Sequence, residues 1–117
     1  MLEELKSQLQ AKAAQAADEA MALASEGRGD EAALRRIREN IFGVFVSVIE
    51  ASANPRAGAD PVAFFASRLE TIPASWRAAH ASAQERGDEI RLAQEGAKLS
   101  ALDEVEEAFR ELCGDAR

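Results

Sequence analysis

The stretch IFGVFVSVI at residues 41–49 decides the fold of this 117-residue chain. It is the longest uncharged apolar run in the sequence, and it lies between Glu39 and Glu50. A membrane-spanning helix needs about 20 apolar residues, so the run is too short to cross a bilayer. Its β-branched residues would also suit a strand, but the preceding ALRRIREN at 33–40 favours a helix over residues 31–52.

The helix predicted over 31–52 is apolar on nearly all sides. Phe42 and Val46 lie off its main stripe, and a helix of this kind is either central in a bundle or buried in a subunit interface. We therefore expect a homodimer in which Phe42, Val46 and Ile49 form the contact, since a two-fold dimer would bury the same patch on both chains. The main stripe itself has steps of three and four residues: Leu34, Ile37, Ile41, Val44, Phe45, Val48 and Ile49.

Further helices are expected on both sides of this one. Apolar residues with helical spacing predict helices over 2–26, 61–86 and 89–113. A segment rich in Ser, Asn, Gly and Pro at 52–61 predicts a loop. The predicted fold is all-α, an up-down antiparallel bundle of four helices in a single domain over residues 1–117.

Three residues inside the predicted helices disfavour helical backbone. Pro73 predicts a kink or a break in the third helix, with Thr71 as the new cap, which would raise the number of helices to five. Gly43 and Gly96 each cost about 1 kcal/mol relative to alanine. Close approach of another helix is the usual compensation, so we expect both glycines to face a neighbouring backbone.

The string Arg-Gly-Asp-Glu occurs twice, in GRGDEA at 27–32 and in ERGDEI at 85–90. In each string a glycine suits the left-handed end of a helix, and an aspartate suits the cap of the next one. The strings therefore predict two tight helix-to-helix turns, one formed by Gly27 and capped by Asp30, the other formed by Gly87 and capped by Asp88.

The two strings also raise the question of an internal repeat. Aligning Gly29 with Gly87 brings several apolar residues into register, but it also places Phe45 on Asp103. The sequence therefore leaves a repeat open.

Composition excludes some classes of partner and favours others. The net charge of −7 disfavours binding to nucleic acid or to an anionic membrane surface. The excess of acids is larger in the C-terminal half, which makes that half the better place for a basic partner. A single cysteine, Cys113, excludes an intrachain disulfide, and the N-terminus lacks an apolar signal core. We expect a cytoplasmic protein.

Residues for catalysis or metal binding are scarce. His80 is the only histidine, so a carboxylate-bridged dimetal site, which needs two Glu-x-x-His pairs, is excluded. A zinc site would need His80 with the distant Cys113, at a spacing typical of no known motif. We expect no cofactor, no metal and no enzymatic activity.

Two alternatives remain open around Trp76. With Arg77 and His80 as polar anchors, Trp76 could form one wall of a small-ligand pocket; otherwise it packs in the core where the helix bends. The segment AAHASAQERG at 78–87 resembles the helix of histidine phosphotransfer domains in its lone histidine. The lysine and glycine that usually follow are replaced by alanine and glutamine. The favoured hypothesis is a non-catalytic interaction or regulatory protein, with the ligand-binding bundle and a degenerate phosphotransfer domain as alternatives.

Overall fold

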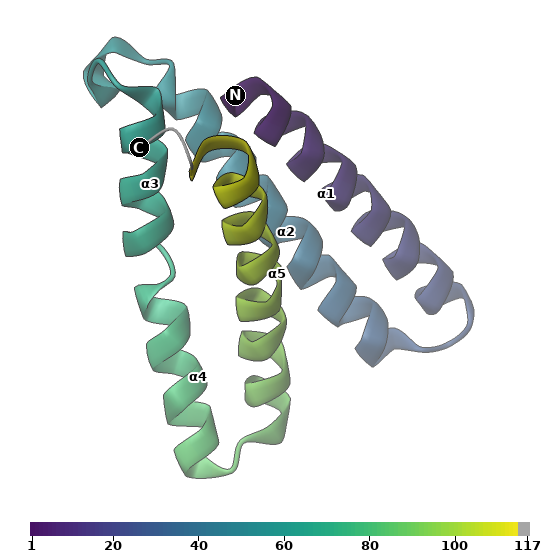
Figure 1. Cartoon of the computed structure of the whole chain (residues 1–117). Helices are drawn as coiled ribbons and strands as arrows, with labels where there is room; N and C mark the ends of the chain where they lie inside the picture. The colour runs from purple at the N-terminus through teal and green to yellow at the C-terminus, as the bar shows by residue number, and fades with distance from the viewer. Residues whose placement is uncertain (115–117) are drawn as a thin grey trace.

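The computed structural model describes residues 1–114, and Figure 1 shows them as helices joined by short turns. The element order is α1 (Leu2–Ser25), α2 (Gly29–Ser52), the short 3-10 helix η1 (Pro55–Ala57), α3 (Pro61–Thr71), α4 (Ala74–Arg86) and α5 (Glu89–Cys113). The predicted all-α fold is confirmed, and successive long helices run in opposite directions (Figure 1).

The third predicted helix is broken in the structure. α3 ends at Thr71 and α4 begins at Ala74, because Pro73 has no N–H to donate to the preceding turn. The predicted cap is wrong: Thr71 belongs to α3, and Pro73 stands at the N-cap position of α4 without a side-chain hydrogen bond. At the start of α3, the Asp60 carboxylate accepts a hydrogen bond from the backbone N–H of Ala63 at 3.1 Å.

The two hairpin turns have the same hydrogen-bond pattern. Gly27 and Gly87 are left-handed, with φ of 77° and 67°. In both turns the next residue donates its N–H back into the last helical turn, from Arg28 to the Leu23 carbonyl at 2.9 Å and from Asp88 to the Ala83 carbonyl at 3.0 Å.

The capping prediction holds for one turn only. Asp88 caps α5, since its carboxylate accepts a hydrogen bond from the N–H of Arg91 at 3.1 Å. The prediction for Asp30 is wrong: α2 begins at Gly29 with Arg28 as its N-cap, which already places Asp30 inside the first turn. The turn glycines are Gly27 and Gly87, as predicted. Gly29 of the first Arg-Gly-Asp-Glu string already lies inside α2, so the two strings occupy different positions in their turns.

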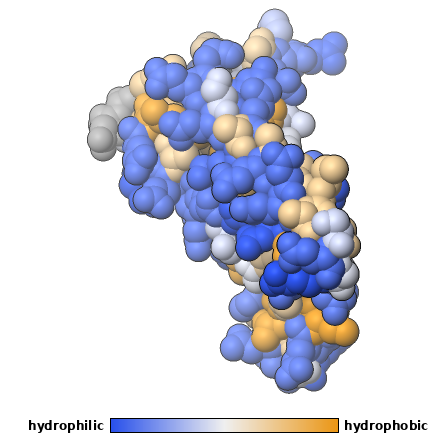
Figure 2. Space-filling view, turned by 90° about the vertical axis from the view of Figure 1, so that its right-hand side faces the viewer, coloured by the Kyte–Doolittle hydropathy of each residue, from blue (hydrophilic) through white to orange (hydrophobic). Residues whose placement is uncertain are grey.

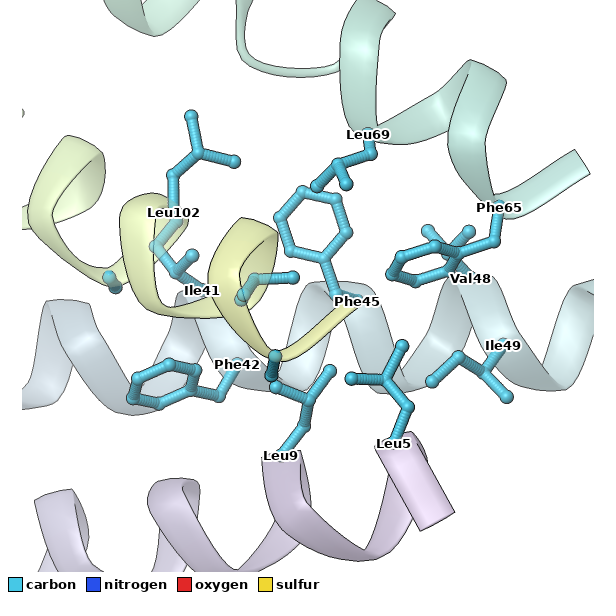
Figure 3. Packing of buried hydrophobic residues seen from close by; sticks show 13 residues of the cluster. Leu5, Leu9, Ile41, Phe42, Phe45, Val48, Ile49, Phe65, Leu69 and Leu102 are labelled. Carbon is cyan, nitrogen blue, oxygen red and sulfur yellow. The ribbon is translucent and has the colours of Figure 1, made fainter. Parts of the chain in front are cut away.

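The apolar run of α2 forms the centre of the hydrophobic core (Figure 3). Phe42 lies on the α1 side of α2, whereas Phe45 points toward α3, where its ring meets that of Phe65 edge-on with centroids 6.0 Å apart. The other residues of the core come from α1, α2, α3 and α5: Leu5, Leu9, Ile41, Val48, Ile49, Leu69, Ala101, Leu102, Val105 and Ala108.

Burial of this run corrects the predicted dimer contact. Phe42 is 0% exposed and Ile49 is also buried, so neither offers a surface to a second chain. Val46 is half-buried and packs against the same core. Leu5 and Leu9 of α1 cover one side of the run, and α5 crosses another (Figure 3).

The expectation for Gly43 and Gly96 is also wrong. A Cβ atom added to either glycine would find no neighbouring atom within 4 Å. Neither residue faces another backbone, so close packing does not compensate for the cost of these glycines.

A structural repeat relates the two halves of the chain. A shift of 60 residues, the spacing from Gly27 to Gly87, carries α1 onto α3 and α4 together and α2 onto α5. It also aligns buried residues with one another, as in the pairs Leu5 and Phe65, Leu9 and Leu69, Phe42 and Leu102, and Phe45 and Val105. Aligning Gly29 with Gly87 did not reveal this repeat, because that shift is two residues shorter than the shift from Gly27 to Gly87.

The halves also pack reciprocally. α2 crosses α5, α2 contacts α3, and α5 contacts α1, as expected for two hairpins related by an approximate two-fold axis through the crossing. Beyond the crossing the hairpins diverge toward their turns (Figure 1). The radius of gyration is 15.4 Å, against about 13 Å for a near-spherical domain of this length.

Candidate functional site

Where the hairpins diverge, a hollow lies between the N-terminal halves of α2 and α5. We call it the tip cleft, and it has two lobes that share Leu34 and Ala93. The arginine lobe, of ≈ 480 Å³, adds Leu23, Ala97 and Ser100 to four charged residues: Arg28, Glu31, Arg35 and Arg38. The acidic lobe, of ≈ 290 Å³, is completed by Asp30, Ala33, Glu89, Ile90 and Gln94.

The acidic lobe is lined by residues that the repeat relates to one another. The 60-residue shift pairs its own lining residues: Asp30 with Ile90, Ala33 with Ala93, and Leu34 with Gln94. Equivalent positions of the two halves therefore face each other across the lobe, although their side chains differ.

Ile90 is the most exposed large apolar residue in the described part of the chain, at 77%. Ile90 continues the apolar spacing of its helix, but it lies on the surface because the hairpins have already separated near the α4–α5 turn (Figure 1). Seen from the side, apolar surface gathers on the α4–α5 tip, below a strongly hydrophilic α1–α2 tip (Figure 2).

The charges of the arginine lobe are largely compensated. Arg28 forms ion pairs with Glu26, at 3.2 Å, and with Glu31. Arg35 reaches Glu19 at 3.6 Å. The lobe therefore has little uncompensated positive charge to offer an anion.

Arg38, which also lines the arginine lobe, belongs to an ionic group. Glu104 of α5 accepts hydrogen bonds from Arg38 of α2 and from Lys12 of α1, the latter at 3.1 Å. Burial raises the pKa of Glu104, but the two cationic donors together outweigh this effect and hold the pKa below its usual range. The Arg38 guanidinium also lies 5.2 Å from the centroid of the Phe42 ring. This group ties α1, α2 and α5 together.

Glu95 of α5 is buried at 4% exposure, which the sequence did not indicate. Its Oε2 accepts a hydrogen bond from Lys98 at 3.1 Å, whereas its Oε1 has no hydrogen-bond partner among residues 1–114. It does not line either lobe of the cleft.

The residues proposed around Trp76 have separate environments. The Trp76 ring packs edge-on against Phe45, with centroids 6.2 Å apart, so it contributes to the core at the bend. Arg77 is exposed and pairs with Glu106 at 3.8 Å, beside a different hollow lined by Leu69 and Phe109. His80 is half-buried on α4, whereas phosphotransfer uses a histidine on an exposed face.

Other chemistry finds little support in the described residues. No three of the His, Cys, Asp and Glu side chains within residues 1–114 are grouped so that they could hold a metal ion. Cys113 is buried, and burial raises the pKa of its thiol. Within the same residues, no helix combines the length and apolarity needed to span a membrane.

Comparisons with models of known protein families, with curated proteins and with solved structures find no match for this chain. Function must therefore be argued from the residues themselves, and the tip cleft is the feature that most needs explaining.

Proposed function

We propose that the chain is a non-catalytic interaction module that receives a partner protein in the tip cleft. The observation that carries this proposal is Ile90, 77% exposed at the edge of a hollow shared by two hairpins. Single exposed apolar residues are common on protein surfaces. Ile90, however, lines a groove between two helices, and such grooves are a recurrent place for partner segments to dock.

The arrangement of reactive groups supports a non-catalytic role. His80 lies on α4 and the buried Cys113 ends α5, so the chain's only histidine and only cysteine are on different helices. The arginines of the cleft are paired with carboxylates. A cytoplasmic location is part of the proposal, since a single cysteine suits a reducing compartment.

The alternatives drawn from the sequence have less support. A dimer through residues 41–49 is not part of this proposal, because that run is buried within the chain. A ligand pocket at Trp76 would need the ring that instead packs on Phe45. The tip cleft requires neither.

Site-specific photo-crosslinking in cells that express the protein tests the proposal. A photoreactive phenylalanine replaces Ile90 in one variant and Met21 in another, the latter being a large apolar residue of α1, 62% exposed, that lines neither lobe. We expect a discrete protein adduct from position 90 and none of that size from position 21. The same adducts from both positions, or no adduct from position 90, would refute the proposal.

A further inference from the structure

The mouth of the tip cleft is negatively charged. Asp30 and Glu89 line the acidic lobe, and neither forms an ion pair with any residue in the range 1–114. The two turn segments add to this charge: residues 26–31 hold three acids and one arginine, and residues 85–91 hold three acids and two arginines. The N-termini of α2 and α5 each contribute about +0.5 charge, which offsets only part of the excess.

The apolar part of the same lobe contains few large side chains. Ile90 at the edge and Leu34 are the larger ones, while Ala33 and Ala93, which the 60-residue shift aligns, also line the lobe. Alanine leaves room for the backbone of an incoming helix to approach, and the flanking larger residues can then contact its apolar side chains.

We infer that the occupant of the tip cleft is a basic amphipathic helix of a partner protein, which deepens the proposed function and rests on it. The apolar face of this helix packs on Ile90, Leu34 and the two alanines, and its lysines or arginines lie near Asp30 and Glu89. Helix-in-groove binding uses anchors at i, i+3 or i+4, and i+7, a spacing that suits a groove between two diverging helices.

The charge of the cleft argues against the other occupants. A second copy of this chain would bring another acidic tip, and a net charge of −7, against the same acids. A small molecule would find an open lobe of ≈ 290 Å³, at the lower limit of the about 300–1,000 Å³ typical of ligand sites. An anion would have to displace carboxylates from paired arginines in the other lobe.

Three synthetic peptides test the inference with the intact protein. Each is a helix of about 18 residues, or five turns, with leucines at one spacing, and only the polar residues differ: lysine, glutamine or glutamate. Binding is measured by fluorescence anisotropy, and the contact is located by NMR chemical-shift changes. We expect the lysine peptide to bind at the tip cleft, with an affinity that falls as salt is added, and the glutamate peptide not to bind there.

Matched protein variants distinguish binding of the peptide in the cleft from nonspecific attraction between opposite charges. Ile90→Ser should weaken binding of the lysine peptide about tenfold, while Met21→Ser leaves it unchanged. Asp30→Asn combined with Glu89→Gln should weaken binding and flatten its salt dependence. Asp18→Asn combined with Asp103→Asn removes the same charge from exposed positions outside the cleft and should have less effect.

The outcomes distinguish this inference from the proposed function. If the glutamine or glutamate peptide binds the cleft as tightly as the lysine peptide, the basic-helix inference fails and the interaction role stands. Equal losses in the cleft and control variants, or shift changes spread over the acidic surface, would also overturn the inference. If no peptide binds, the inference fails, and the crosslinking experiment alone decides the interaction role.

Discussion

Four glycines allow a test in which two substitutions should stabilise the protein and two should destabilise it. Gly43 and Gly96 are helical, and an added Cβ atom meets nothing within 4 Å, so alanine should fit both positions without strain. Gly27 and Gly87 have positive φ values of 77° and 67°. Alanine at these two positions must adopt a left-handed conformation that L-residues disfavour.

The magnitudes follow from these environments. Glycine inside a helix costs about 1 kcal/mol relative to alanine, so Gly43→Ala and Gly96→Ala should each raise the free energy of unfolding by about that amount. The left-handed conformation costs alanine about 1–2 kcal/mol, so Gly27→Ala and Gly87→Ala should each lower it by at least about 1 kcal/mol. With about 2.1 cal/mol/K of unfolding entropy per residue, 1 kcal/mol corresponds to roughly 4 °C in Tm for 117 residues.

Urea titrations followed by far-UV circular dichroism measure all four variants under one condition. Gly43 and Gly96 lie in different helices, so the double variant should gain the sum of the two single changes. A loss of stability in Gly43→Ala would mean that something presses on α2 where the structure leaves open space. Unchanged stability in Gly87→Ala would refute the left-handed turn.

Three further outcomes are expected. Asp88→Ala should lose about 1 kcal/mol in a urea titration because Asp88 caps α5, whereas Asp30→Ala should lose clearly less; equal losses would contradict the assignment of the caps. Because the folded-state pKa of Glu104 is lowered, its contribution is complete above its unfolded pKa of about 4.3 and is lost as pH falls through the folded value. The stability difference between wild type and Glu104→Gln should therefore shrink in urea titrations below about pH 4, and a gap that is constant with pH would count against the pairing. Phe42→Glu should unfold, since it places a charge at a site with 0% exposure; a folded protein of half the wild-type mass in sedimentation equilibrium would restore the dimer contact.

The helices themselves were predictable from the sequence. Apolar spacing placed the last helix at 89–113, as found, and Pro73 predicted the break that separates α3 from α4. These features depend on local physics: periodicity, a missing N–H group and an aspartate at a helix start. The cap at Asp88 was predicted correctly for the same reason, because capping depends on residues within one turn of the helix.

Features that depend on how the hairpins cross could not be predicted. Phe42 lies off the main stripe of α2, and only the presence of both α1 and α5 around it explains its burial. Ile90 continues the stripe of its helix, yet the partner helix has diverged at that level, so the same pattern ends in an exposed residue. Periodicity identifies the apolar face of a helix but says nothing about how far a neighbour follows it.

The 60-residue repeat has a consequence for what the tip cleft can discriminate. Two separate identical hairpins would place the same side chain on both sides of their symmetry axis. Any cleft on that axis would therefore be two-fold symmetric, and a ligand could bind it in either of two opposite directions. Joining the hairpins in one chain removes this restriction, and here the repeat relates Asp30 to Ile90 and Leu34 to Gln94. A segment lying across the axis therefore meets different side chains at equivalent positions of α2 and α5, which gives the cleft a polarity and its occupant a single direction.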